Sequence, residues 1–385
     1  MPGVENSLKM ENKGLRTWIE INKAAAENNY KIFRKLIGKN CLLMAVVKSN
    51  AYGHGLVDFS QLMQKMGADW LAVDSIVEAS ALRKAGIRKN ILVLGYTLPE
   101  KFNEAAKNNI SLTISSPAHL EPIKRLKFSR PLKTHLKIDT GMRRQGFLIG
   151  EVPTLTKVFK KTGKNLILEG VYTHFAAAKN PAFPSDTLKQ IKIFEDAISI
   201  FKSEGFNPLK HASATSGAII FPQSRYDIVR IGIGLYGLWP SKETEAAFRD
   251  KINLKPVLSW KTIVGEIKNA AKGERIGYDF TETFLKPTKV AILPVGYWHG
   301  YPRALSSIGR VIIRGKLAKV LGRVSMDMIS VDISDIKNAK IGDEVIIIGK
   351  DGKNKITADD IADLAGTSSY EIISRLNPLI KRIIC

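Results

Sequence analysis

One lysine in the sequence ends an apolar run and enters a turn that is rich in small residues. Lys48 closes the run at residues 42–47 and is followed by SNAYGHG. A lysine in this setting loses part of its solvation, which favours the neutral amine that forms a Schiff base with a carbonyl compound. Gly53 and Gly55 allow a ligand to approach the backbone closely, and Tyr52 lies within reach if a helical turn starts there. A solvated surface charge is the alternative explanation of such a lysine.

Polar side chains also follow other apolar runs at the points where those runs end. They are Lys137, Asp139, His174, Thr215, Ser216 and Arg230. Each has an ordinary structural explanation, such as a hydrogen-bonded core histidine, a Lys137–Asp139 surface pair, or an ion pair of Arg230 with Asp227. Their joint occurrence at the ends of predicted strands favours a common site.

Eight short β-rich apolar runs must position these side chains. They predict strands at residues 42–47, 70–73, 91–94, 110–114, 134–138, 166–172, 209–212 and 226–231. Helix signals lie between them: Ser75 and Glu78 form a capping box, and Gly86 ends that helix. A longer helix with an apolar stripe over residues 188–201 follows Pro184. This alternation predicts an α/β fold, a (β/α)8 TIM barrel, whose reactive groups collect at the C-terminal ends of the strands.

The pattern changes after Pro240. Residues 241–255 are polar and predict a linker. Closely spaced strand candidates follow at residues 257–267, 290–295, 311–313, 328–333 and 345–348, with a helical end starting at Thr357. We therefore expect a polar N-terminal extension at residues 1–14, the barrel at residues 15–255, and a mainly antiparallel β domain at residues 256–385.

Composition limits the class of protein. The net charge is +23, but lysine and arginine are scattered along the chain, which argues against a nucleic-acid-binding protein. Cys41 and Cys385 provide neither a disulfide framework nor metal-ligand spacing, so no metal site is expected. The polar N-terminus lacks the apolar core of a secretory signal, and no stretch is long and apolar enough to cross a bilayer. We expect a cytoplasmic protein.

The string AVVKSNAYGHG, residues 45–55, closely resembles the cofactor-lysine motif of alanine racemases. Six further family-like strings follow in the family's order: LKIDTGMRRQGF, VYTHFA, VRIGIGLYGL, GYDFT, LPVGY and GRVSMD. The resemblance covers residues 15–385 and agrees with the separate prediction of a barrel and a β domain. It implies a pyridoxal 5′-phosphate (PLP) enzyme, a homodimer with shared active sites, that interconverts L- and D-alanine and supplies D-alanine for peptidoglycan.

The resemblance also implies two proton-transferring groups. Lys48 would hold PLP as a Schiff base and act as the base on one face of the substrate α-carbon. Tyr278, supplied by the second subunit, would be the acid/base on the other face. Racemisation needs both, because a single group would return the proton to the side it left. The structural alternative for Tyr278 is a hydroxyl bonded to nearby backbone.

Further roles follow from the same resemblance. Arg230 would hydrogen-bond the pyridine nitrogen, and His174 would lie on or beside the ring. Lys137, often carbamylated in the family, would orient Arg144 toward the cofactor hydroxyl and the substrate carboxylate. The cofactor phosphate would be bound by Tyr52, Thr215, Ser216, Gly232 and Ile233. Met326 and Asp327 of the second subunit would close the substrate site.

The sequence departs from the family pattern in four places. His299 and Lys179 stand where acidic residues are common, Pro378 stands where many members have a phosphate-binding tyrosine, and Thr215 replaces a serine. The more basic entrance leaves open a racemase of broader or different amino-acid specificity. A related barrel-type PLP decarboxylase and a non-catalytic PLP carrier are further alternatives.

Overall fold

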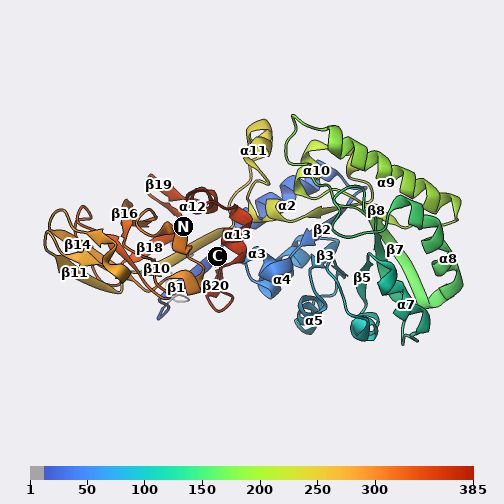
Figure 1. Ribbon diagram of the computed structural model, residues 1–385, viewed down its shortest axis with the longest axis horizontal. Coiled ribbons are helices and arrows are strands. Elements are labelled where there is room, and N and C mark those ends of the chain that lie inside the picture. The colour runs from blue at the N-terminus through green and yellow to red at the C-terminus, as the bar shows by residue number, and fades with distance from the viewer. Residues whose placement is uncertain (1–12) are drawn as a thin grey trace. The chain divides into compact units, whose positions relative to one another are not determined.

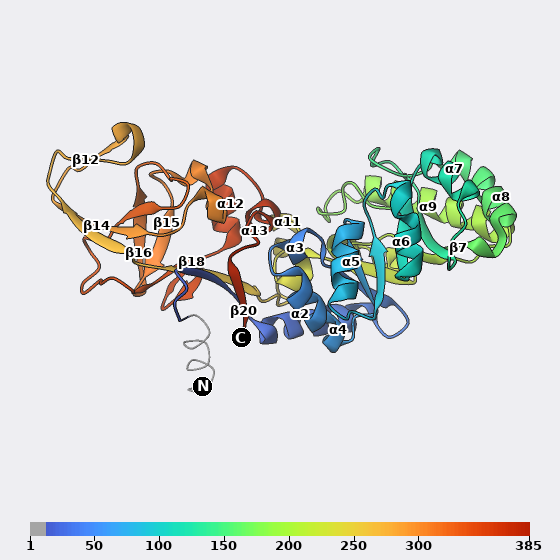
Figure 2. The same ribbon diagram turned by 90° about the horizontal axis from the view of Figure 1, so that it is seen from below.

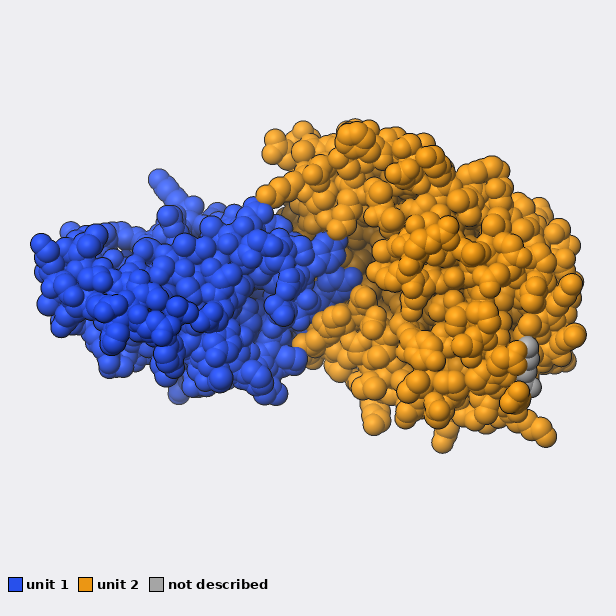
Figure 3. Space-filling view, in the orientation of Figure 1, with its two compact units in different colours: residues 1–25, 52–55, 256–385 blue, residues 26–51, 56–255 orange. Residues whose placement is uncertain are grey.

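The computed structural model describes residues 13–385, except the side chain of Lys124. Most of the expected N-terminal extension therefore lies outside the described residues. The described chain forms two compact units (Figure 3). Unit 2 contains Ala26–Ala51 and Leu56–Lys255, whereas unit 1 contains the chain before Ala26, the short segment Tyr52–Gly55, and Pro256–Cys385.

Unit 2 is built on eight parallel strands in the order β8-β7-β6-β5-β4-β3-β2-β9. The strands are β2 (Leu42–Val46), β3 (Trp70–Val73), β4 (Asn90–Val93), β5 (Ile110–Ile114), β6 (Leu132–Lys137), β7 (Leu166–Tyr172), β8 (Leu209–His211) and β9 (Ile228–Ile231). Asp227 N–H donates to Lys210 O and Arg230 N–H donates to Ser213 O, which joins the two ends of the sheet. The predicted TIM barrel is confirmed, with each strand within two residues of its expected bounds.

Helices lie outside the barrel strands (Figures 1 and 2). They are α2 (Lys23–Ile37), α4 (Leu56–Met66), α5 (Ile76–Lys84), α6 (Phe102–Lys107), α7 (Pro117–Arg125), α8 (Val152–Thr162), α9 (Ser185–Ser203), α10 (Thr215–Ile220) and α11 (Lys242–Phe248). The short segment α3 (Lys48–Tyr52) follows the end of β2. The predicted capping box of Ser75 and Glu78 begins α5, and Gly86 follows its end with φ +82°. Every residue of β3 and β5 is buried, because helices cover the outside while side chains fill the inside of the barrel.

Unit 1 is built on a mainly antiparallel sheet in the order β11-β14-β17-β16-β15-β18-β10-β1-β20. Its strands are β1 (Thr17–Ile21), β10 (Leu258–Ile263), β11 (Glu266–Ala270), β14 (Thr288–Leu293), β15 (Arg310–Ile313), β16 (Lys316–Leu321), β17 (Ile329–Asp332), β18 (Glu344–Asp351) and β20 (Lys381–Ile384). β19 (Asn354–Ile356) pairs with β18, and β12 (Arg275–Ile276) pairs with β13 (Glu282–Thr283). Helices α12 (Ala358–Ala365) and α13 (Ser369–Ser374) complete the unit.

Three local expectations differ from the structure. The expected barrel domain began at residue 15, but β1 pairs antiparallel with β10 and parallel with β20 in the other sheet. The single strand expected at residues 257–267 is two strands, separated at Gly265, whose N–H donates to Ile292 O. The linker expected at residues 241–255 contains α11, whose N-cap Ser241 accepts a hydrogen bond from Thr244 N–H. Within the described part of the chain, no helix combines the length and apolar character needed to cross a membrane.

Candidate active site

The chain after Lys48 forms a left-handed turn, so the ordinary helical turn that would have brought Tyr52 within reach is not formed. Ser49, Asn50, Ala51 and Tyr52 all have φ between +51° and +56°. This region costs a residue with a side chain roughly 1–2 kcal/mol, so four in succession persist only where neighbouring groups hold them.

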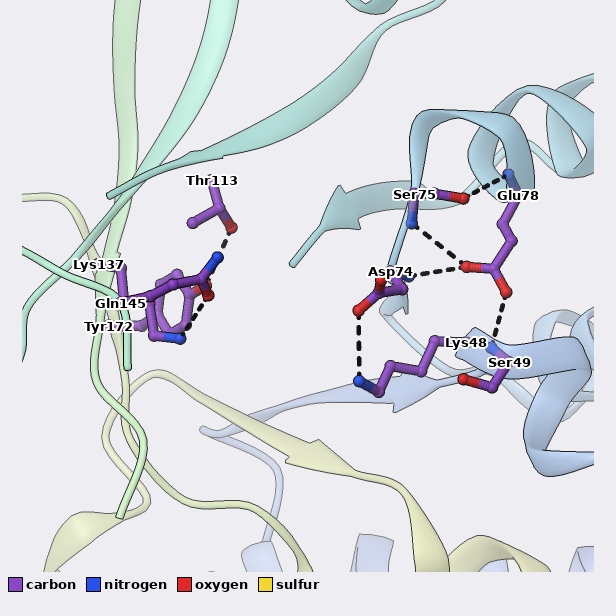
Figure 4. Close-up of polar contacts among 9 residues, drawn as sticks. All are labelled: Lys48, Ser49, Asp74, Ser75, Glu78, Thr113, Lys137, Gln145 and Tyr172. Carbon is purple, nitrogen blue, oxygen red and sulfur yellow. Dashed lines mark hydrogen bonds and ion pairs between the residues drawn. The ribbon is translucent and has the colours of Figure 1, made fainter. Parts of the chain in front are cut away.

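Hydrogen bonds from unit 2 hold this turn in place. Ser49 N–H donates to Glu78 Oε1 at 2.7 Å, and Asn50 Oδ1 accepts from Leu56 N–H at 2.8 Å. The other oxygen of the Glu78 carboxylate accepts from the N–H groups of Asp74 and Ser75 (Figure 4). One acidic cap residue thus joins the start of α5 to the turn that carries the lysine.

The amine of Lys48 lies at the C-terminal end of β2. Its Nζ is 3.3 Å from Asp74 Oδ1, and its side chain is 36% exposed (Figure 4). The side chain is therefore partly shielded from solvent, which agrees with the partial loss of solvation expected from the sequence. Its position at the strand end agrees with the site predicted from sequence.

Lys137 is the buried lysine of the site, and only 5% of this residue is exposed to solvent. Its Nζ donates to Gln145 Oε1 at 3.1 Å and lies 5.6 Å from the centre of the Tyr172 ring (Figure 4). Burial, followed by the positive charges of Arg144 and Arg230, lowers the pKa of Lys137 to about 8. The alternative Lys137–Asp139 pair does not form, because the Asp139 carboxylate accepts from backbone N–H groups at residues 141 and 143.

Arg230 is buried and has most of its donors engaged. Its Nη1 donates to His211 Nδ1 at 2.8 Å, and its Nη2 donates to the carbonyl oxygens of Thr173 at 2.8 Å and Ala212 at 2.7 Å. The alternative ion pair with Asp227 is absent, since that carboxylate lies 3.2 Å from Lys210 Nζ. Among the described residues nothing accepts a hydrogen bond from the Arg230 Nε–H, so this donor is available to a ligand.

His174 lies beside the same guanidinium. Its Nδ1 is 3.4 Å from Arg230 Nη2. Burial, followed by the charges of Arg230 and Arg144, lowers the pKa of His174 to about 3. The ring is therefore neutral at physiological pH, and Nδ1 must be its unprotonated nitrogen because a guanidinium has no acceptor.

Of the residues expected to bind phosphate, all but Tyr52 lie after β8 and β9. Thr215 Oγ1 accepts from the N–H groups of Gly232 at 3.3 Å and Gly234 at 3.4 Å, and Ser216 follows it in α10. A Cβ on Gly234 would lie 2.3 Å from Phe33 Cζ, so only glycine allows this loop to approach the hydroxyl so closely. Ile233, which lies between these two glycines, begins the short 3₁₀ turn Ile233–Tyr236.

These groups fit PLP. Arg230 offers an unpaired donor for a ring nitrogen, Lys48 offers an amine for an aldehyde, and Thr215 lies in a loop cradle of the kind that binds phosphate at this end of barrels. All three belong to unit 2. The arrangement can therefore hold the coenzyme between an amine and a buried cation.

Tyr52 and Tyr278 belong to unit 1. The Tyr52 ring lies 6.2 Å from that of Tyr370. Tyr278 begins a short 3₁₀ turn after Gly277 and is 69% exposed. The alternative of a hydroxyl bonded to nearby backbone does not hold for Tyr278, which makes no such bond within residues 13–385. Its phenol is free to meet a ligand.

The loop that carries Met326 and Asp327 is fixed by the neighbouring turn of unit 1. Tyr297 N–H donates to Ser325 O, and Trp298 N–H donates to Met326 O, both at 3.0 Å. Met326 is exposed, while Asp327 Oδ1 lies 4.0 Å from His299 Nδ1. Burial lowers the pKa of His299, although the Asp327 charge opposes this.

Sequence reasoning missed the supporting residues. Asp74 was not singled out, although it directly follows β3, and Glu78 was expected only to cap α5. A buried group behind Arg230, comprising His211, His135 and Glu169, was also missed. Its members alternate with apolar residues along the strands, which is the only signal that they point into the barrel.

Comparison with known proteins agrees with this geometry. Family models described as the N-terminal and C-terminal domains of alanine racemase match residues 21–240 and 257–384. The alanine racemase of Leptospira interrogans serovar Lai is 39% identical, over 96% of this chain and 95% of that protein. The alanine racemase of Methanococcus maripaludis is 38% identical, over 95% of this chain and 98% of that protein. The crystal structure of the Bacillus anthracis alanine racemase with bound L-Ala-P has a TM-score of 0.91 at 34% identity and covers 96% of this chain and 95% of that one. The chain therefore belongs to the alanine racemase family.

Proposed function

We propose that the chain interconverts L- and D-alanine with PLP bound through Lys48 at the mouth of the barrel. The observation that carries this proposal is the buried guanidinium of Arg230, whose Nε–H has no acceptor among the described residues. A pyridine nitrogen is an acceptor of the kind this donor lacks. A permanent cation there also disfavours protonation of the ring nitrogen.

The chemistry divides between two side chains. When bound, the coenzyme ring withdraws electrons from the substrate α-carbon and makes its proton acidic. Lys48 then removes or returns that proton on one face, and Tyr278 does so on the other. Arg144 binds the substrate carboxylate. The D-alanine produced in this way supplies peptidoglycan synthesis in the cytoplasm.

The proposed enzyme is a homodimer in which Tyr278, Met326 and Asp327 complete the site of the partner. Exposed apolar side chains support this assignment, because they lie in or beside the loop at residues 322–328, and a free surface rarely carries such a cluster. These side chains are Tyr278, Phe280, Tyr297, Trp298, Met326 and Met328. An active monomer in analytical ultracentrifugation would contradict the shared site.

We also propose that Lys137 is carbamylated. With a pKa of about 8, a substantial fraction of this amine is neutral at pH 7–8 and able to add carbon dioxide. The resulting anion would replace one of several crowded positive charges and could pair with Arg144. Protein equilibrated with ¹³C-bicarbonate should show a carbamate resonance that is missing from Lys137→Met.

The decisive assay measures products. The purified protein loaded with PLP would be incubated with L-alanine and then with other L-amino acids, and the D-enantiomer measured in each case. Alanine should turn over fastest. If it does not, the second candidate holds, a racemase of different specificity, which His299 near Asp327 favours by replacing a common acid with a base.

The lysine assignment has its own test. Borohydride treatment of the PLP-loaded protein should fix the coenzyme to Lys48, as peptide mapping would show. Lys48→Ala should remove the yellow absorbance, whereas Lys133→Ala, at the other end of the barrel, should retain it. Labelling at a different lysine would overturn the assignment.

A further inference from the structure

A row of polar side chains runs from Arg230 through the barrel interior to an acidic residue. Arg230 Nη1 lies 2.8 Å from His211 Nδ1, and His211 Nε2 lies 2.8 Å from His135 Nδ1. His135 Nε2 in turn lies 3.4 Å from Glu169 Oε2. Both histidines are completely buried. All four residues belong to unit 2.

The proton positions in this row are set from its two ends, a guanidinium that only donates and a carboxylate that only accepts. A guanidinium only donates, so His211 Nδ1 must accept and its proton must lie on Nε2. That proton faces His135 Nδ1, which must therefore also accept. The proton of His135 consequently lies on Nε2 and faces the Glu169 carboxylate. Burial lowers the pKa of each histidine, in agreement with two neutral rings.

Packing holds both rings in this orientation. The Tyr172 ring stacks on His211 with centroids 4.7 Å apart, and the Trp70 ring meets His135 edge-on at 5.3 Å. Gly170 pairs with His135 across the sheet, and a Cβ there would lie 2.2 Å from His135 Nδ1. Only glycine at this position leaves space for the ring.

Glu169 is itself fixed at the far end. Its Oε2 accepts from Ser111 Oγ at 2.5 Å, and its Oε1 lies 3.3 Å from Lys133 Nζ. Burial raises the pKa of Glu169, but the neighbouring His135 ring and the hydrogen bond from Ser111 outweigh it, so the pKa lies below its usual value. The row therefore ends in a carboxylate that only accepts.

We propose that Glu169, His135 and His211 are positioning residues, which fix both histidine tautomers and so hold the Arg230 guanidinium with its Nε–H directed at the coenzyme. The role of Arg230 toward the coenzyme rests on the proposed function. The tautomers do not, because they follow from contacts within the chain. Without an acceptor at residue 169, the Nδ1–H tautomer of His135 would gain population and point its proton at that of His211. The hydrogen bond that orients Arg230 would then weaken.

The first experiment reads the tautomers directly. ¹⁵N-histidine labelling and long-range ¹H–¹⁵N spectra of the PLP-loaded dimer distinguish protonated from unprotonated ring nitrogens. His135→Gln and His211→Gln would assign the signals among six histidines. Both rings should be neutral with the proton on Nε2. A proton on Nδ1 of either ring, or a doubly protonated ring, would overturn the proposal.

The second experiment separates positioning from simple packing. Glu169→Leu removes the acceptor, whereas Glu169→Gln retains one. The leucine variant should show averaged His135 nitrogen shifts and about a fivefold rise in transamination events per racemisation turnover, the scale of one lost buried hydrogen bond. The glutamine variant should stay within about twofold of the parent protein.

Ser111→Ala is the matched control, since it removes a hydrogen bond to the same carboxylate from outside the row. Its transamination ratio and histidine shifts should not change. The positioning role would be refuted if Glu169→Leu and Glu169→Gln had the same ratio of transamination to racemisation. It would also be refuted if Ser111→Ala raised that ratio as much as Glu169→Leu does. A protein without racemase activity would refute the proposed function alone, because the nitrogen shifts need no substrate.

Discussion

Gly53 offers the sharpest test of how the segment after Lys48 is held. Its φ is +83°, and a Cβ at this position would lie 1.9 Å from the carbonyl oxygen of Ile373. Arg382 donates to Gly53 O from Nε at 3.1 Å and Nη2 at 3.0 Å, so the peptide cannot easily move away. Gly86 has nearly the same φ, +82°, but nothing within 4 Å of its would-be Cβ. The two alanine variants therefore differ in the clash and share the backbone strain.

The expected magnitudes follow from these two terms. A side chain in the left-handed region costs roughly 1–2 kcal/mol, which applies to both Gly53→Ala and Gly86→Ala. Displacing packed backbone adds about 1–3 kcal/mol for Gly53→Ala only. The reduced entropy of the unfolded chain affects both variants alike and cancels. We expect Gly53→Ala to lose about 1–3 kcal/mol more unfolding free energy than Gly86→Ala.

Urea unfolding of both variants at one protein concentration measures this difference. Fluorescence and circular dichroism would be followed together. The urea midpoints would then be converted into unfolding free energies with one common m-value. Equal losses would show that unit 1 yields around Ile373 without cost and would refute the account of Gly53. An unchanged Gly53→Ala would refute the close approach itself.

Three further predictions concern the site. Tyr278→Phe should slow racemisation by about 10²–10⁴-fold, while the α-proton of one enantiomer still exchanges with deuterated solvent. Equal loss of exchange from both enantiomers would contradict the two-sided mechanism. Arg230→Glu should raise transamination per racemisation turnover, measured as pyridoxamine phosphate formed, and an unchanged ratio would count against the role of the cation. In CO2-free buffer, Lys137 is neutral when folded but protonated when unfolded between about pH 8 and 10.5. Unfolding free energy should thus rise by about 3 kcal/mol across that range relative to Lys137→Met, and parallel profiles of the two proteins would refute the lowered pKa.

Much of the barrel could be predicted because its strands are short, apolar and separated by clear helix signals. The capping box at Ser75 and the end of α5 at Gly86 were also predicted correctly. Strand ends in a barrel meet on one face, so the order of strands was enough to bring Lys48, Lys137 and Arg230 to one end of the barrel. The roles of these residues came from the resemblance and are still proposals.

What the sequence could not reveal depends on long-range partners. β1 has the alternation of an ordinary strand, and nothing local indicates that it pairs with residues more than 200 positions away. β16, with the sequence KLAKVL, was not expected because charged residues interrupt its apolar pattern. The left-handed turn after Lys48 has no glycine at its first four positions, so turn chemistry gave no signal for it. The ion pair of Lys48 with Asp74 joins residues that follow two different strands, β2 and β3.

The position of β1 between β10 and β20 has a consequence for biosynthesis. Thr17 bonds to Trp260 across 243 positions, and Ile21 bonds to Cys385 across 364. At about 5–20 residues per second, a ribosome leaves β1 without either neighbouring strand for roughly 12–50 s. During that interval an apolar strand with two open edges is a target for chaperones and for pairing with other nascent chains. Expression yield should therefore respond to translation speed between β1 and β10.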